Sequence, residues 1–162
     1  MKPKLIQRVA KLVPYPAKNS TVPALAFAYH FEPTPEQNLE LGSLFVAIEV
    51  MAREALASQV VDLVIKTIGE HYYNQKFNDE VPVRFEKTVD LLNKQLAELL
   101  TSHHGKSIGH IHAVFAILNG ENLYLTKTGK AHALLYRGTK TTEISAGLED
   151  GSTIQKSFRN IA

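Results

Sequence analysis

Residues 109–145, GHIHAVFAILNGENLYLTKTGKAHALLYRGTKTTEIS, decide the fold that the sequence predicts. Asn119-Gly120 separates two apolar runs, and this pair is typical of a type I′ hairpin turn, which needs a positive φ at both central residues. Further turns are predicted at Thr128–Lys130 and Arg137–Lys140, where a glycine is flanked by polar residues. The stretch therefore predicts a meander of four antiparallel strands.

The faces of this meander follow from the pairing of its strands. Pairing about the Asn119-Gly120 turn would place Leu118 opposite Glu121, Ala116 opposite Leu123 and Val114 opposite Leu125. One face would then carry Val114, Ala116, Leu123, Leu125 and Leu134, and the other Ala113, Phe115, Ile117, Tyr124, Ala133 and Leu135. Because both faces are apolar, we expect an inner sheet, packed by helices on one side and by a second sheet on the other.

The elements before the meander predict an α+β protein. Apolar runs of strand length cover 25–31 and 41–49, and apolar residues spaced by three or four predict helices over 51–73 and 83–102. Two successive helices cannot both cross between parallel neighbours, so a layered α+β arrangement is expected over 24–162 as one domain. Four prolines set the N-terminal segment 1–23 apart from regular structure.

The composition narrows the classes of function. The chain has 162 residues, a formal net charge of +2 and no cysteine. This near balance of charge favours neither nucleic acid nor an anionic membrane as a partner. The lack of cysteine excludes disulfides and cysteine nucleophiles, and no apolar run approaches the length of about 18 residues that reads as a membrane span. We expect a cytoplasmic protein.

Three motifs, in this order along the chain, resemble those of the protein phosphatase 2C (PPM-type) family. Residues 45–51 (FVAIEVM) and 53–58 (REALAS) are similar to the family's FAVADGMGGH strand end and its Gly-Glu-x-Ala-Ser helix, with Glu49 at the aspartate. Residues 109–114 are similar to a Gly-Thr-Thr-Ala-like strand start, and 127–137 (KTGKAHALLYR) to NVGDSRAYLYR. The resemblance implies a four-layer αββα sandwich, of which this chain would lack the C-terminal part.

The same resemblance implies metal-dependent hydrolysis of phosphoesters, but this chain lacks carboxylates at positions where the family binds its metal ions. The family holds two divalent ions with carboxylates, and such a pair generates a hydroxide nucleophile. Lys130 stands at one of the aspartate positions and Val50 at the glycine whose carbonyl resembles a ligand. Glu49 is the one candidate metal ligand that remains, with Mg or Mn as its ion. We therefore expect no cofactor and assign no catalytic residue.

The histidines support a second metal hypothesis. His110 and His112 alternate onto one face of the same strand, and His132 would lie near them across the meander. Imidazole nitrogens at such spacing can bind zinc. In the opposing interpretation these side chains lie at the rim of the sheet and are hydrogen-bonded or solvated. The metal hypothesis is weakened because no carboxylate stands nearby in the sequence to fix the histidine tautomers.

The charged residues near the strand ends are also open to two interpretations. Glu49 is either a cation ligand or a cap for the helix that follows it. A group of basic residues at turns of one sheet edge either binds phosphate or opposes edge-to-edge aggregation. This group comprises Lys127, Lys130, Arg137 and Lys140.

These features favour a catalytically degenerate PPM-like domain that binds or regulates a protein partner, with a phosphoprotein among the candidates. An active metal-dependent serine/threonine phosphatase, incomplete in this chain, is the alternative from the enzyme class. A third hypothesis is a structural module that forms a homodimer through an exposed sheet edge.

Overall fold

The computed structural model describes residues 10, 24–74, 79–102 and 107–148, together with the backbone of 153–157. One antiparallel sheet has the order β1 (Ala24–Phe31), β2 (Ser43–Met51), β3 (Ile111–Asn119), β4 (Asn122–Thr128) and β7 (Thr153–Ser157). A separate two-stranded sheet contains β5 (Leu134–Arg137) and β6 (Lys140–Glu143). The helices are α1 (Pro35–Leu41), α2 (Glu54–Thr67) with its π-helical extension η1 (Ile68–Tyr72), and α3 (Val81–Thr101).

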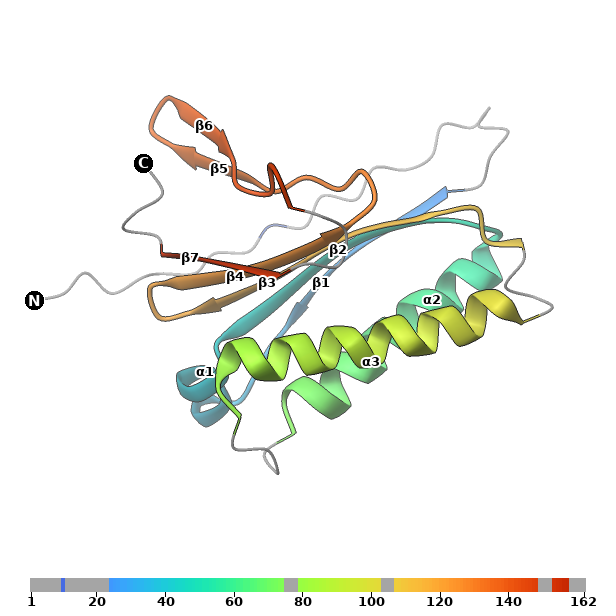
Figure 1. Cartoon of the computed structure of the whole chain (residues 1–162), viewed down its shortest axis with the longest axis horizontal. Helices are drawn as coiled ribbons and strands as arrows, with labels where there is room; N and C mark the ends of the chain where they lie inside the picture. Colours follow the sequence, from blue (N-terminus) through green and yellow to red (C-terminus); the bar gives the residue numbers. More distant parts are fainter. Residues whose placement is uncertain (1–9, 11–23, 75–78, 103–106, 149–152, 158–162) are drawn as a thin grey trace, which may run out of the picture.

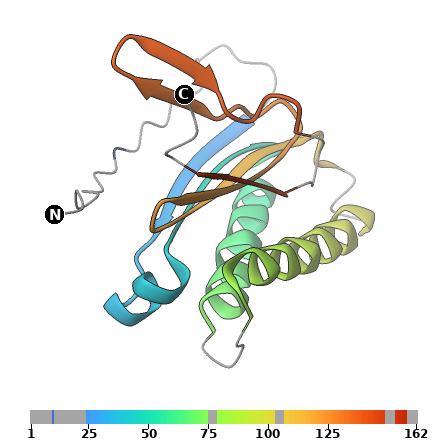
Figure 2. The same cartoon turned by 60° about the vertical axis from the view of Figure 1, so that its left-hand side comes forward.

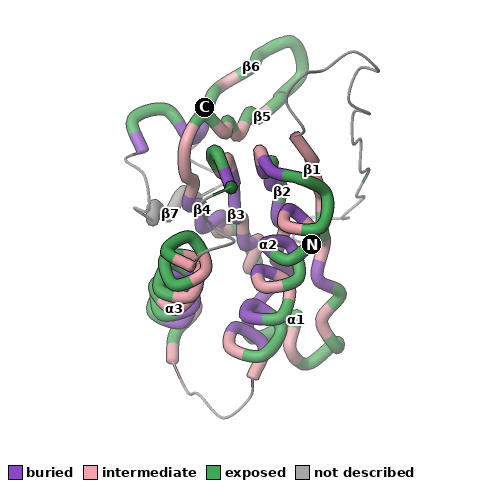
Figure 3. The backbone as a smooth tube through the Cα atoms, turned by 90° about the vertical axis from the view of Figure 1, so that its right-hand side faces the viewer, coloured by how far each residue is buried: buried purple, intermediate pink, exposed green. Residues whose placement is uncertain are grey.

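The elements are arranged in layers. Helices α2 and α3 lie against one face of the five-stranded sheet, and the β5–β6 hairpin lies over the other (Figures 1 and 3). This arrangement confirms the predicted α+β class and the two predicted long helices. Residues 1–23, predicted as a separate segment, lie outside the described residues except for Ala10. None of the described helices is long and apolar enough to cross a bilayer.

Alternate residues of the central strands build two cores. Val46, Ile48, Val50, Ala113, Phe115 and Ile117 share the larger core with residues of α2 and α3 such as Val60, Val64 and Phe85. On the opposite face, Val114, Leu123 and Leu125 pack with Ile144 and Leu148, which follow β6. The prediction that both faces are apolar is therefore confirmed, since side chains alternate between the two faces of each strand.

The predicted register of the β3–β4 hairpin is wrong by two residues. Leu118 pairs with Leu123, Ala116 with Leu125 and Val114 with Lys127. The two residues between the strands are Gly120 and Glu121, and only Gly120 has a positive φ, of 56°. The type I′ turn about Asn119-Gly120 is thus also wrong, and a glycine at the first central position suits a type II′ turn instead. Because the slip is two residues, each side chain keeps its predicted face.

The predicted four-stranded meander ends after β4. The chain leaves the sheet, forms the β5–β6 hairpin and returns as β7, a strand that the sequence did not predict, to pair with β4. The alternation of faces is therefore not carried into β5. Ala133 and Leu135 pack on the Val114 side rather than the Phe115 side, and Leu134 is half-exposed.

Helix α1 is absent from the sequence-based prediction, although its capping signal is present in the sequence. It connects β1 to β2 at one end of the sheet (Figure 2). Thr34 Oγ1 accepts a bond from the Gln37 amide, and Gln37 Oε1 accepts one from the Thr34 amide, at 3.3 and 2.9 Å. This reciprocal capping box, with Pro35 in the first turn, starts the helix inside a stretch whose prolines favour a break.

The end of α1 is tied to the core by a buried tyrosine. The Tyr72 hydroxyl donates to the Leu41 carbonyl at 2.6 Å, and burial raises the pKa of this hydroxyl, which keeps it a donor. Tyr72→Phe is expected to lower the free energy of unfolding by about 1–3 kcal/mol, because the Leu41 carbonyl is left buried without this donor. Chemical denaturation measures the change, and Tyr136→Phe, at an exposed position, is the control. An equal effect of both substitutions would contradict this role of the bond.

Candidate functional site

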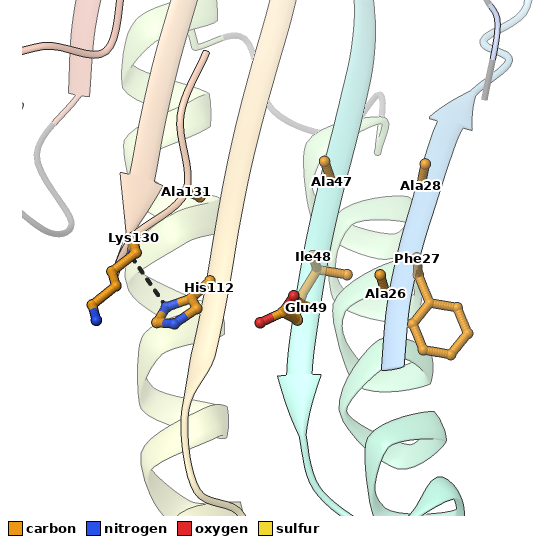
Figure 4. A pocket seen from close by; sticks show the side chains of 9 residues that line it. All are labelled: Ala26, Phe27, Ala28, Ala47, Ile48, Glu49, His112, Lys130 and Ala131. Atoms are coloured by element: carbon orange, nitrogen blue, oxygen red, sulfur yellow. Dashed lines mark hydrogen bonds between the residues drawn. The ribbon is translucent and has the colours of Figure 1, made fainter. Parts of the chain in front are cut away.

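A pocket of about 480 Å³ opens over β1, β2 and β3 (Figure 4). It lies on the sheet face opposite α2 and α3, because its residues Ala47 and Glu49 alternate with Ile48, which belongs to the helix-side core. Small side chains form its floor: Ala26, Ala28 and Ala47. Glu49, His112 and Lys130 supply its polar groups. We call this site the Glu49 pocket.

The strand register brings a carboxylate and an imidazole together. Glu49 on β2 is the pairing partner of His112 on β3. In Figure 4 the Glu49 carboxylate points toward β3, and the His112 ring leans toward Lys130. His110 lies two residues before His112, and the centroids of their rings are 4.5 Å apart. Glu49, His110 and His112 can each offer one ligand atom, and these atoms all lie within 4.8 Å of one another.

The turn after β4 closes the pocket on its third side. Lys130 donates its backbone N–H to Nδ1 of His112 at 3.1 Å, the bond drawn in Figure 4. Gly129 has a φ of 62°, and a Cβ built on it would lie 2.1 Å from the same Nδ1. The turn thus rests directly on the imidazole ring. It fixes the ring orientation and brings the Lys130 side chain to the pocket that contains Glu49.

The structure separates other residues that the sequence grouped together. His132, the candidate third histidine, does not join the ligand group of His110 and His112 and instead pairs with Glu143 on β6 at 2.6 Å. That hydrogen bond is the main cause that lowers the pKa of the Glu143 carboxyl. The grouping of four basic residues is wrong. Lys127 donates to the Gly129 carbonyl beside the pocket, whereas Arg137 and Lys140 are paired in the β5–β6 sheet.

The capping interpretation of Glu49 is not supported either. Helix α2 begins after Arg53, which is its N-cap and makes no side-chain capping bond. Glu49 lies within β2, four residues earlier, and faces the pocket. Its pairing with His112 is the contact that sequence reasoning missed. A usable signal was the similar length and two-sided apolar character of 41–49 and 111–119, which suits adjacent central strands.

The fold defines the class of protein that this chain resembles. No family model matches the sequence, and no curated protein matches it. Among solved structures, the fold matches that of serine/threonine phosphatases, which confirms the predicted likeness to the PPM type for the fold.

The matching structures are of one Mycobacterium tuberculosis enzyme. The serine/threonine phosphatase PstP/Ppp matches with 18% identity and a TM-score of 0.51, over 80% of this chain and 55% of that chain. The catalytic domain of PstP in complex with two manganese ions matches with 18% identity and a TM-score of 0.51, over 76% of this chain and 56% of that chain. The chain thus spans about half the length of the solved chains that it matches.

The Glu49 pocket does not fit a pair of manganese ions. Hard divalent cations take oxygen ligands, and two of them in one site need several carboxylates. Among the described residues, Glu49 is the one carboxylate that lines the pocket, and the grouped ligands beside it are imidazoles. Lys130 also lines the pocket, and its side chain carries a positive charge and has no acceptor atom for a cation.

Proposed function

We propose that this chain is a catalytically degenerate, phosphatase-like domain of the cytoplasm that binds a protein partner at the Glu49 pocket. In this proposal the chain corresponds to the N-terminal part of a four-layer αββα sandwich, and it needs no cofactor for binding. The fold match to serine/threonine phosphatases supports the ancestry. The observation that carries the proposal is the presence of Lys130 in the pocket where Glu49 is the one carboxylate among the described residues.

The charge of the pocket favours a phosphorylated partner. Lys130 and His112 both line the pocket, and a phosphate group accepts charge-assisted hydrogen bonds from both side-chain types. The alanine floor leaves room for a phosphorylated side chain above β1 and β2. The backbone scaffold would thus be kept while the ligand changes from a metal to an anion.

Hydrolysis is the measurement that tests degeneracy. With manganese present, we expect the wild-type chain to hydrolyse a generic phosphoester no faster than Glu49→Gln. The reason is that one carboxylate cannot hold the metal pair that activates water. Manganese-dependent turnover that Glu49→Gln abolishes would overturn the proposal and support the alternative, an active metal-dependent phosphatase. That alternative draws its support from the manganese-bound neighbour, and it requires carboxylates outside the described residues.

Binding is tested separately, with phosphorylated and unphosphorylated forms of one peptide set. Lys130→Ala is expected to weaken binding of phosphopeptides about tenfold or more, because a hydrogen bond to a charged group contributes about 1.5–3 kcal/mol. Lys140→Ala, in the β5–β6 sheet, is the charge-matched control and should leave the affinity unchanged. Equal affinity for both peptide forms, or equal loss in both variants, would contradict recognition of phosphate by the pocket.

A homodimer is a separate proposal that rests on the sheet edge. Among the described residues, β1 and β7 are the two outer strands of the five-stranded sheet. Edge strands of this length can pair with a second copy. A solution mass equal to one chain over a wide range of concentration would exclude this role.

A further inference from the structure

Glu49, His110 and His112 have the composition and spacing of a transition-metal site. Their potential ligand atoms lie within 4.8 Å of one another without any ion present. Around a tetrahedral ion with bonds of about 2.0–2.1 Å, ligand atoms are about 3.4 Å apart. Small rotations of the three side chains would therefore close the site, with no change in the pairing of β2 and β3.

The backbone that carries these ligands is well fixed. Strands β2 and β3 are inner strands of the five-stranded sheet, each paired on both sides. The Met51 amide donates to the His110 carbonyl at 2.9 Å, so the pairing continues past the ligands to the strand ends. Ligands on such elements keep their relative positions better than ligands on loops.

The donor set selects the class of metal. Two imidazole nitrogens and one carboxylate suit zinc and similar borderline ions, whereas magnesium and manganese favour all-oxygen sites. The ligand set therefore differs from what a pair of manganese ions would require. Three protein ligands also leave one position of a tetrahedral ion open toward solvent, since Glu49 and His110 are exposed.

The bond between Lys130 and His112 decides which nitrogen would bind the ion. Nδ1 of His112 accepts the Lys130 N–H, and the Gly129 backbone lies against that nitrogen. Only Nε2 is therefore accessible to an ion. A neutral imidazole that binds a metal through Nε2 carries its proton on Nδ1, where it cannot accept a hydrogen bond. Metal loading would thus release the Lys130 amide from the ring.

We propose that Glu49, His110 and His112 bind one zinc-like divalent ion, and that binding uncouples the turn at Gly129 and Lys130 from His112. The site shares Glu49 and His112 with the pocket of the proposed partner binding, but ion binding is measured without a partner, so failure of one proposal can be told from failure of the other. The site is independent of hydrolysis, because both of its readouts are measured without substrate.

Cobalt is the probe for the site, because Co²⁺ replaces zinc in such sites and absorbs visible light when it is bound by nitrogen ligands. The full chain without a histidine tag is expected to bind one Co²⁺ and to release it on addition of Zn²⁺. Glu49→Gln and His110→Ala should each weaken binding at least about tenfold, since even loss of a group that supports a ligand costs about 10–100-fold. His132→Ala is the matched control, because His132 is exposed, is paired with Glu143 and is not among the three grouped ligands.

Circular dichroism first shows that each variant is folded, so that a loss of metal binding can be assigned to the substituted side chain. Absence of Co²⁺ and Zn²⁺ binding at millimolar concentration would overturn the site, and so would equal loss of affinity in His132→Ala. A second readout is the NMR signal of the Lys130 amide. Zn²⁺ should shift this signal strongly and leave that of Lys140 unchanged, whereas binding with an unmoved Lys130 amide would overturn the coupling to the turn.

Discussion

Gly42→Ala is expected to lower the free energy of unfolding by about 2–6 kcal/mol. Gly42 has φ 75° and ψ −172°, a backbone conformation that is essentially restricted to glycine and costs other residues about 1–3 kcal/mol. A Cβ would also lie 2.3 Å from the Leu118 carbonyl oxygen and 2.8 Å from Asn119 Cα. Both atoms belong to the backbone of β3, so the overlap forces the strand to shift, which costs about 1–3 kcal/mol more.

The matched control is Gly147→Ala. Gly147 has nearly the same φ, 76°, but a Cβ there would meet no atom within 4 Å. Its substitution should cost only about 1–2 kcal/mol, the penalty for a left-handed conformation. Urea denaturation of both variants measures the difference. If the two variants are equally stable, the contact between Gly42 and β3 does not hold the corner between α1 and β2.

Gly129→Ala is expected to destabilise the protein by about 1.5–3.5 kcal/mol and to disrupt the Glu49 pocket. Its φ of 62° costs alanine about 1–2 kcal/mol. The new Cβ would also displace the His112 ring, which lies 2.1 Å from its position, so the bond from the Lys130 amide is lost. Loss of this hydrogen bond adds about 0.5–1.5 kcal/mol.

Gly138→Ala isolates the effect of the ring. Gly138 has a φ of 57° in the β5–β6 turn, and a Cβ added to it would have open space within 4 Å. The Gly129 variant should therefore be the less stable of the two, and only in that variant should the NMR signals of the His112 ring move. Unchanged His112 signals in Gly129→Ala would mean that the turn does not hold the ring.

The sequence predicted those parts of the fold that depend on local patterns. The two-sided apolar run from Leu44 to Ile48 correctly indicated an inner strand, and helical spacing located α2 and α3. The capping box at Thr34 and Gln37 is also a local pattern. The prolines around it favour a break in regular structure, and α1 was therefore not predicted. The prediction was less accurate where the chain changes direction. Which side chains after Lys130 face the core depends on the path of the chain through the turn, and no local pattern reports this path.

The candidate site was predicted only in pieces. Glu49 and the pair His110 and His112 were each singled out, but their approach depends on the register between strands that are about 60 residues apart. That register follows from packing of both strands on α2 and α3, which no local motif reports. No carboxylate stands near the histidines in the sequence, but strand pairing places Glu49 beside them in space.

The bond from the Lys130 amide to His112 makes this amide a natural sensor of the state of the pocket. An exposed turn amide normally exchanges its hydrogen readily with solvent, but that of Lys130 has a side-chain acceptor from another strand. Its rate of hydrogen exchange should therefore rise when the acceptor nitrogen is taken away and fall when the bond re-forms. A single residue-resolved exchange measurement on the unmodified chain thus reports the occupancy of the site, without a label, a substrate or an engineered variant.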